Sequence, residues 1–299
     1  MKTIKQRISY AVMGLMAMGF TACTQNEDMA PTLKGQEINA TFSVGGIQTR
    51  VNTLGHGNSW EDKDKLKVSI FTDNDPGSTT VLSFNGETNE WSRSGSFRWL
   101  NEYEQHTILA VYPSDMDSWI YNLQYDLQTD QSSEGNLKNA DLITGYWHDV
   151  PRFDLISIPM KHRMSLVTIV YHVGTADYPN MDISEPQVYS KHTSVGFSRD
   201  DRGQFVMSTP TANPAWVKAY KHDDGMFSAI VIPGSYIKDE VFLKFMIGDN
   251  IFNAKMKMPT DFEEGKRYTY KLDVGKDKVD LTRISVDDMT GWTNEDDLK

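Results

Sequence analysis

Cysteine is nearly absent from this sequence, since its 299 residues contain only one, Cys23. A lone cysteine excludes an internal disulfide and a cysteine-ligated zinc site, so stability must come from a hydrophobic core. Positive charge is also scarce, with 30 lysines and arginines against 41 acidic residues and a net charge of −11. This balance argues against nucleic acid as a partner, because nucleic acids reward basic patches. Beyond the N-terminus, no apolar run reaches the roughly 20 residues that span a bilayer.

Motifs of common catalytic and cofactor sites are missing too. The seven histidines are scattered without an HExxH pair, and there is no GxSxG elbow, P-loop or GxGxxG. The stretch DNDPG at 73–77 resembles a calcium loop only superficially, because the twelfth position from Asp73 is Phe84 instead of glutamate. A hairpin turn is the better interpretation. Carboxylates are plentiful, but their spacing singles out no glycosidase-like pair. We therefore expect no enzyme activity, no metal and no cofactor.

The N-terminus has the three parts of an export signal. Three basic residues lie within the first seven, an apolar run follows at 11–20, and small residues stand directly before Cys23. Small residues before a lone cysteine resemble the lipobox of bacterial lipoproteins, in which the thiol is acylated, although Phe20 departs from the commonest pattern. The resemblance implies a signal peptide at 1–22 and a lipid anchor, palmitate included, on Cys23. The alternative is a buried free cysteine after an ordinary signal.

The residues after the cysteine bear on location. The segment 23–35 is polar and acidic at its start, which favours a flexible tether. Glu27 and Asp28 look like the signal that sends some Bacteroidetes lipoproteins to the outer face. Loss of residues 1–22, with three basic residues and no acidic one, takes the net charge from −11 to −14. We expect a surface-exposed protein anchored by lipid to the outer membrane.

The hydrophobic pattern is almost entirely that of β-strands. Apolar and polar residues alternate, or short apolar runs occur, between clusters of Gly, Pro, Asn and Asp. We predict strands at 37–44, 65–71, 106–112, 165–173, 226–232, 240–247 and 267–274. Residues 116–145 have no clear period, and 135–145 is the best candidate for a helical or irregular segment. Many short strands favour an all-β fold, and the length favours two sandwiches, at 36–157 and 158–299.

Five segments in sequence order resemble the fimbrillin-like family of Bacteroidales fimbrial subunits. They are SWEDKDKLKVSIF (59–71), IPMKHRMSLVTIVYHV (158–173), AIVIPGSY (229–236), FEEGKRYTYKLDV (262–274) and ISVDDMTGW (284–292). The resemblance implies two transthyretin-like β-sandwiches in tandem and a role as shaft, tip or anchor subunit of a pilus. In the first segment we expect Trp60 to be an aromatic plug and Asp64 a turn-capping carboxylate.

The family also implies assembly by strand exchange after an arginine-specific protease removes the first strand. Here Arg50 is the candidate maturation site, because it follows strand 37–44 across Gly45-Gly46. The removable strand would insert the alternating side chains Ile38, Ala40, Phe42 and Val44. Its loss would expose an unpaired edge and apolar pockets for another chain's strand.

The candidate donor strand lies within residues 278–292, which contain the apolar side chains Val279, Leu281, Ile284 and Val286. The step from 281 to 284 breaks a period of two, so a bulge or turn is expected there. The implied partners are other fimbrial subunits, in a homo- or hetero-polymer that serves adhesion and biofilm formation.

Two alternatives stay open at this point. Arg50 could be an ordinary loop arginine, and Arg152, Arg199 and Arg202 would be cut as well if exposed. The rival function is a surface glycan-binding lipoprotein that uses exposed aromatic platforms. The tryptophans that could supply such platforms are Trp91, Trp99, Trp119, Trp147 and Trp216.

Overall fold

The computed structural model describes residues 32–44, 60–92, 95–116, 122–174, 182–200, 204–222, 225–275 and 279–289. Within these ranges the chain forms twenty strands and one short helix, α1 (Glu134–Asn139). The prediction of an all-β fold is therefore confirmed.

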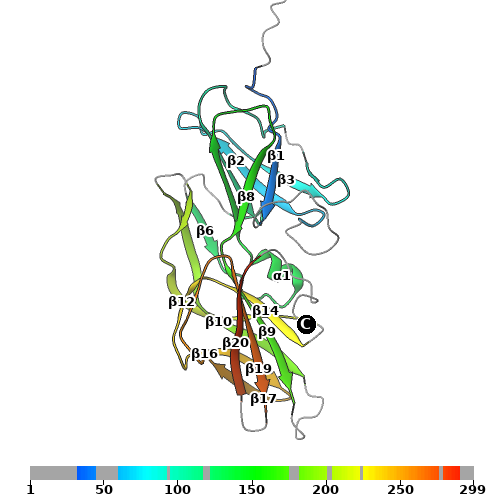
Figure 1. Cartoon of the computed structure of the whole chain (residues 1–299), viewed down its shortest axis with the longest axis vertical. Coiled ribbons are helices and arrows are strands. Elements are labelled where there is room, and N and C mark those ends of the chain that lie inside the picture. Colours follow the sequence, from blue (N-terminus) through cyan, green and yellow to red (C-terminus); the bar gives the residue numbers. More distant parts are fainter. Residues whose placement is uncertain are drawn as a thin grey trace, which may run out of the picture. The chain divides into compact units, whose positions relative to one another are not determined.

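A seven-stranded sheet contains most of the N-terminal strands (Figure 1). Its order is β1 (Ala40–Val44), β8 (Ile156–His162), β7 (Ile143–Asp149), β5 (His106–Tyr112), β2 (Lys65–Phe71), β3 (Ser78–Asn85) and β4 (Glu90–Trp91). The pairs are antiparallel except for β1 and β8, which run parallel. β1 and β4 are the two ends of this sheet.

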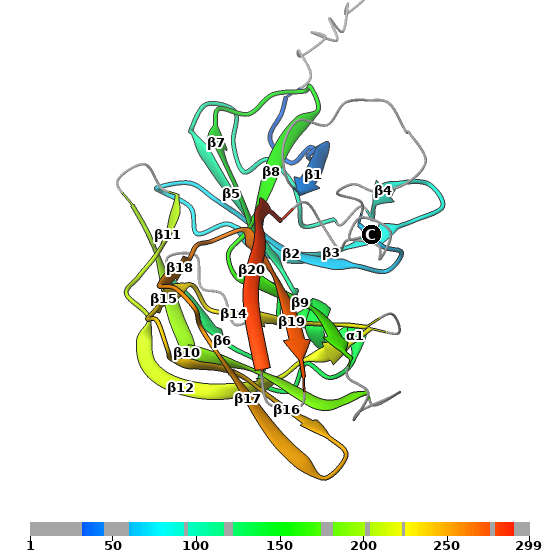
Figure 2. The same ribbon diagram turned by 60° about the horizontal axis from the view of Figure 1, so that its bottom comes forward.

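Three further sheets contain the remaining strands (Figure 2). A six-stranded sheet has the order β11 (Phe205–Met207), β10 (Ile183–Arg199), β16 (Val241–Ile247) and β17 (Asn250–Lys255), with β12 (Thr211–Lys218) and β6 (Asn122–Asp126) also paired to β10. A five-stranded sheet has the order β13 (Tyr220–Lys221), β14 (Met226–Val231), β9 (Ser165–Val173), β19 (Lys266–Val274) and β20 (Val279–Asp288). A two-stranded sheet pairs β15 (Gly234–Tyr236) with β18 (Thr260–Phe262).

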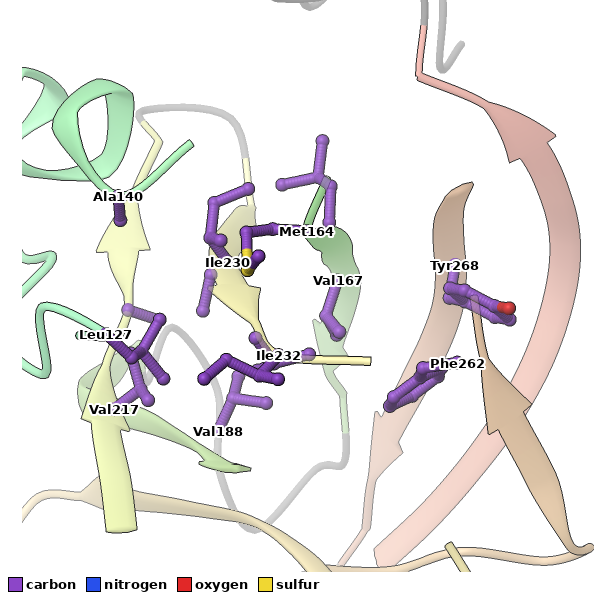
Figure 3. Packing of buried hydrophobic residues seen from close by; sticks show 14 of the residues in the cluster. Leu127, Ala140, Met164, Val167, Val188, Val217, Ile230, Ile232, Phe262 and Tyr268 are labelled. Atoms are coloured by element: carbon purple, nitrogen blue, oxygen red, sulfur yellow. The ribbon is translucent and has the colours of Figure 1, made fainter. Parts of the chain in front are cut away.

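Buried apolar side chains form two clusters. The smaller one is built from residues between 38 and 160 and includes side chains of β1. The larger one draws mainly on the other three sheets; Figure 3 shows part of it, where the rings of Phe262 and Tyr268 lie with their centroids 4.4 Å apart. Burial of one such aliphatic or aromatic side chain stabilises the folded state by about 1.5–3 kcal/mol. These clusters therefore supply the stability that the sequence cannot obtain from disulfides.

Most predicted strands are found where the sequence places them. Those at 65–71, 106–112 and 165–173 are confirmed as β2, β5 and β9, and three later ones as β14, β16 and β19 within one residue at either end. The candidate helical or irregular segment at 135–145 covers all of α1 except Glu134 and ends in β7. The first turn of α1 is capped by the Ser133 hydroxyl, which accepts from the Asn136 N–H at 3.2 Å. The long strand β10 was not predicted.

The DNDPG segment forms the hairpin turn that the sequence favours, between the antiparallel strands β2 and β3. Gly77 has a φ of +64°, and a Cβ placed there would lie 1.7 Å from the carbonyl oxygen of Ile70. Only glycine satisfies both conditions without movement of the backbone. The Asp75 carboxylate accepts from the Gly77 N–H at 2.8 Å and therefore closes the turn.

The division into sandwiches at 36–157 and 158–299 stays a prediction. β8 runs across positions 157 and 158, and β6, from the first predicted sandwich, pairs with β10.

Candidate functional site

The first strand is attached to the rest of its sheet by one ladder only. β1 runs parallel to β8 with Ala40 opposite Ile156 and Val44 opposite Met160, and it has no second strand partner in the order of the sheet. β8 in turn pairs with β7 only through residues 160–162. Residues 156–159 of β8 therefore have β1 as their paired neighbour.

The chain enters β1 through a short pairing with another segment. Residues 35–38 bond to residues 97–99, with the Ile38 N–H donating to the Phe97 carbonyl at 3.1 Å and the Trp99 N–H donating to the Gln36 carbonyl at 3.0 Å. The contact with β8 begins where the Ile156 N–H donates to the Asn39 carbonyl at 2.9 Å. The strand predicted at 37–44 is regular only from Ala40 because its first residues pair with a different segment.

The side chains of this segment alternate as the sequence predicts. Phe42, Val44 and Ile38 are 2%, 5% and 8% exposed, and all three belong to the smaller hydrophobic cluster. Ala40 is half-buried and packs against the same cluster. The intervening Thr41 and Ser43 are also only half-buried. One face of the segment formed by β1 and the residues just before it therefore supplies three large core side chains.

Phe42 lies in an aromatic pocket. Its ring centroid is 5.5 Å from that of Trp91 in an edge-on contact, and Trp91 packs in turn on Trp60 at 5.2 Å. The Trp60 indole N–H donates to the Phe42 carbonyl at 2.7 Å, and the Trp60 ring packs on Tyr112 at 5.7 Å. Trp60 thus bonds to the edge of β1 that no strand occupies, and the prediction of an aromatic plug is confirmed.

An open groove of about 500 Å³ runs beside β1. Its walls combine residues 37–42 with Leu82, Asn89–Ser92, Phe97 and Leu155. β1 and β4 are opposite ends of one sheet, yet Phe42 of β1 contacts Trp91 of β4. The sheet therefore curves until its two edges face each other, and the groove is the seam between them.

Two titratable groups support this part of the sheet. The Asp64 carboxylate accepts from the Glu61 N–H at 2.8 Å, which confirms the predicted cap of the turn before β2, and burial raises the pKa of this carboxyl group. His106 is fully buried in β5; its Nε2 accepts from the Leu100 N–H at 3.0 Å, and its Nδ1 lies 2.9 Å from the Glu104 carbonyl oxygen. A neutral ring with the proton on Nδ1 satisfies both bonds. Burial lowers the pKa of His106, which favours this neutral form.

The candidate donor segment forms β20, which lies at the end of the five-stranded sheet beside β19 (Figure 2). The predicted bulge is present, because Arg283 pairs with Tyr270 and Ser285 with Thr269, which leaves Ile284 as the extra residue. Leu281 is 3% exposed in the larger cluster, and Val279 is half-buried against it. Ile284 in the bulge and Val286 beyond it are 58% and 44% exposed.

Several predicted site residues lie outside the described ranges: Cys23, Arg50, Arg202 and Trp119. Of the competing arginines, Arg152 pairs with Asp149, and its guanidinium lies 5.4 Å from the ring centroid of Trp147. Arg199 is half-buried, with its guanidinium 5.1 Å from the ring centroid of Phe71.

The tryptophans do not form a flat platform within the described part of the chain. Trp99 is buried at 3% exposure, whereas Trp91, Trp147 and Trp216 are half-buried. The ring pairs that tryptophans make there are tilted or edge-on, with interplanar angles from 49° for Trp99 and Trp147 to 83° for Trp99 and His106. A coplanar exposed pair, which would favour glycan binding, is not seen among these residues.

No group of three or more His, Cys, Asp or Glu side chains in the described ranges is arranged to hold a metal ion. Across the same ranges, no helix is long and apolar enough to cross a membrane.

The sequence does not predict the two neighbours of β1, which are β8 and Trp91. Nothing in the pattern of residues 156–162 marks β8 as the parallel partner of β1, because a β-strand carries no signal of its distant partner. Trp91 was considered as a glycan platform, whereas it packs on Phe42. The only local indication that Trp91 belongs to a strand is its position directly after the turn between β3 and β4.

Comparisons with known proteins agree with this architecture. The chain is similar in fold to a candidate cell adhesion protein from Bacteroides ovatus ATCC 8483, with a TM-score of 0.62 and 12% identity over 87% of this chain and 99% of the other. A second one, from Bacteroides uniformis ATCC 8492, has a TM-score of 0.58 and 15% identity over 78% and 94%. A third, from Bacteroides fragilis NCTC 9343, has a TM-score of 0.50 and 9% identity over 87% and 99%. At these identities the likeness concerns the fold alone.

A search of curated proteins gives no match. The model of the fimbrillin-like family, in contrast, matches residues 49–290, which is far more than half of the chain. The protein therefore belongs to the fimbrillin-like family.

Proposed function

We propose that this protein is a fimbrial subunit that assembles by strand exchange after removal of β1. Membership of the fimbrillin-like family supports a role as a fimbrial or adhesion subunit. The single observation that carries the finer proposal is the combination found in residues 38–44, where β1 has one strand ladder but the segment buries the three large side chains of Ile38, Phe42 and Val44.

Removal of β1 would have two physical consequences. Residues 156–159 of β8 would lose their paired strand, which creates an edge that can bind an extended segment. The sites of Ile38, Phe42 and Val44 would become open apolar pockets. At about 1.5–3 kcal/mol for each buried side chain, refilling the three pockets contributes roughly 5–9 kcal/mol. The precursor with β1 in place would therefore not bind another subunit's strand, whereas the protein without β1 would.

Arg50 is the proposed cleavage site, because it lies in sequence between the last residue of β1 and Trp60, the next residue of the aromatic pocket. Arg199 is a poorer candidate because it is half-buried, and Arg152, although exposed, is held by an ion pair with Asp149 and by one ring contact. An arginine-specific protease is the implied partner in maturation.

β20 is the proposed donor strand. It is an edge strand with a bulge at Ile284, and the apolar side chains of Ile284 and Val286 are exposed. Leu281 and Val279 of β20, and Met289 directly after it, contact the larger hydrophobic cluster. The outer edge of β20 has no strand partner in the order of its sheet, and the exposed side chains of Ile284 and Val286 are available to another subunit.

The family and the N-terminal signal support a proposal about location. We propose that lipidation of Cys23 anchors the precursor to the outer membrane and that the mature subunit enters a surface fimbrium serving adhesion and biofilm formation.

The test uses protein that begins at residue 24, treated briefly with an arginine-specific protease. We expect mass spectrometry to show one early cut after Arg50, and an unboiled gel to show a ladder of oligomers only after that cut. The matched controls are Arg50→Lys, which removes the site but keeps the charge, and Arg152→Lys. A ladder that forms equally well with Arg50→Lys, or a clean cut without assembly, would contradict the proposal.

A further inference from the structure

The shape of the site that β1 occupies places conditions on any strand that replaces it. Four positions at a spacing of two face the cluster: an aliphatic one at Ile38, a small one at Ala40, an aromatic one at Phe42 and a β-branched one at Val44. The aromatic position is the most demanding, because Trp91 at 5.5 Å and the Trp60 bond to the Phe42 carbonyl fix both the ring and the backbone. These two contacts also set the register.

The protein's own C-terminal segment does not meet these conditions in any register of strict alternation. With a bulge after Leu281, it would bring Leu281 to the small Ala40 position and the non-aromatic Ile284 to the Phe42 position. Its one aromatic residue in 278–299 is Trp292, and with Trp292 at the Phe42 position, Asp288 and Asn294 would occupy the Ile38 and Val44 positions. With Ile284 at the Phe42 position, Val286 fits the next pocket but Asp280 falls on the Ile38 position.

The remaining registers fail in the same way. Val286 at the Phe42 position brings Asp288 to the Val44 position, and Leu281 there brings Arg283 to it. Met289 there brings Asp287 to the Ala40 position. Each choice puts a charged or amide side chain where β1 has an apolar one, and burial of such a group without a partner is strongly unfavourable.

We infer that the site vacated by β1 selects a strand from a different subunit and rejects the donor strand of a second copy of this chain. The accepted segment carries the pattern aliphatic, small, aromatic, β-branched at alternate positions. This inference rests on the proposed strand exchange and specifies its partner. The wrong strand is rejected because it would bury a charged side chain, and the right strand is accepted because its aromatic side chain fits the pocket. Specificity therefore comes both from unfavourable contacts with the wrong strand and from favourable contacts with the right one. The protein is accordingly a member of a mixed fimbria.

The test is a competition assay on the full chain with a specific protease site inserted between Val44 and Trp60. After cleavage, a fluorescent peptide of residues 36–45 is bound in place of the released strand, and unlabelled peptides compete for it. We expect the Phe42→Ala form of this peptide to bind at least about a hundredfold more weakly, since loss of a buried phenylalanine is of that order. The Ser43→Ala form, changed at a position facing away from the cluster, should stay within a few-fold.

The peptide of residues 278–289 should likewise bind at least about a hundredfold more weakly than that of 36–45. Its variant D280I/T282A/I284F, which restores the four-position pattern, should recover most of this loss. Equal competition by the unchanged peptide, or no recovery in the variant, would overturn the inference while leaving strand exchange intact. If the peptide of residues 36–45 itself does not bind, the proposed function fails and the inference with it.

Discussion

The substitution Phe42→Ala in the uncleaved protein tests how strongly β1 depends on its aromatic pocket. Phe42 is 2% exposed and contacts Trp91 edge-on at 5.5 Å. Truncation of a buried phenylalanine costs about 3–5 kcal/mol, and an aromatic pair accounts for about 0.5–1.5 kcal/mol beyond burial. Because the groove beside β1 lets neighbouring side chains relax into the space, we expect the lower end, about 3 kcal/mol.

The assay is urea unfolding followed by tryptophan fluorescence and circular dichroism. Trp60 and Trp91 lie at the pocket, so their emission should shift to the red in the variant under native conditions. Ser43→Ala is the matched control on the same strand and should change the free energy of unfolding by less than about 0.5 kcal/mol. A loss below about 1 kcal/mol in Phe42→Ala would refute the reasoning, because it would mean that the pocket contributes little to holding β1.

Three other predictions follow from the same contacts. Trp60→Phe keeps a ring but removes the donor to the Phe42 carbonyl, so it should cost about 1–2 kcal/mol in urea unfolding; an unchanged midpoint would disprove the role of that bond. Leu281→Ala should cost about 2–5 kcal/mol and Ile284→Ala less than about 0.5 kcal/mol, and equal losses would contradict the difference in burial between these two side chains of β20. Burial lowers the pKa of His106, so below about pH 6.5 the unfolded chain binds a proton that the fold resists, and the free energy of unfolding should fall as the pH decreases towards the folded pKa. In His106→Gln the free energy of unfolding should fall less steeply with decreasing pH, and an equal pH dependence in both proteins would argue against a lowered pKa of His106.

The strands that could be predicted are those whose pattern is set locally. β2, β5 and β9 are apolar runs bounded by turn residues, and their bounds follow from the sequence. β10 is different, because along its 17 residues the buried side chains are few and register shifts interrupt the alternation. A strand stabilised mainly by four neighbouring strands has little pattern of its own.

The candidate site was predictable in its side chains but not in its surroundings. The alternation of Ile38, Phe42 and Val44 and the break in period at Ile284 could both be found in the sequence, because strand periodicity and bulges are local properties. The parallel pairing with β8 and the contact of Phe42 with Trp91 depend on how the sheet curves until its edges meet. Such long-range geometry leaves no trace in the spacing of residues.

The most direct test of the proposed strand exchange is whether another strand can replace β1 at its site beside β8. Protein cleaved between Val44 and Trp60 would be mixed with an excess of an isotopically heavy peptide of residues 36–45, and native mass spectrometry would follow the mass of the complex. The account predicts that the heavy peptide replaces the original strand while circular dichroism shows an intact β-sheet body. No exchange despite a large excess, or unfolding of the body when β1 leaves, would contradict it.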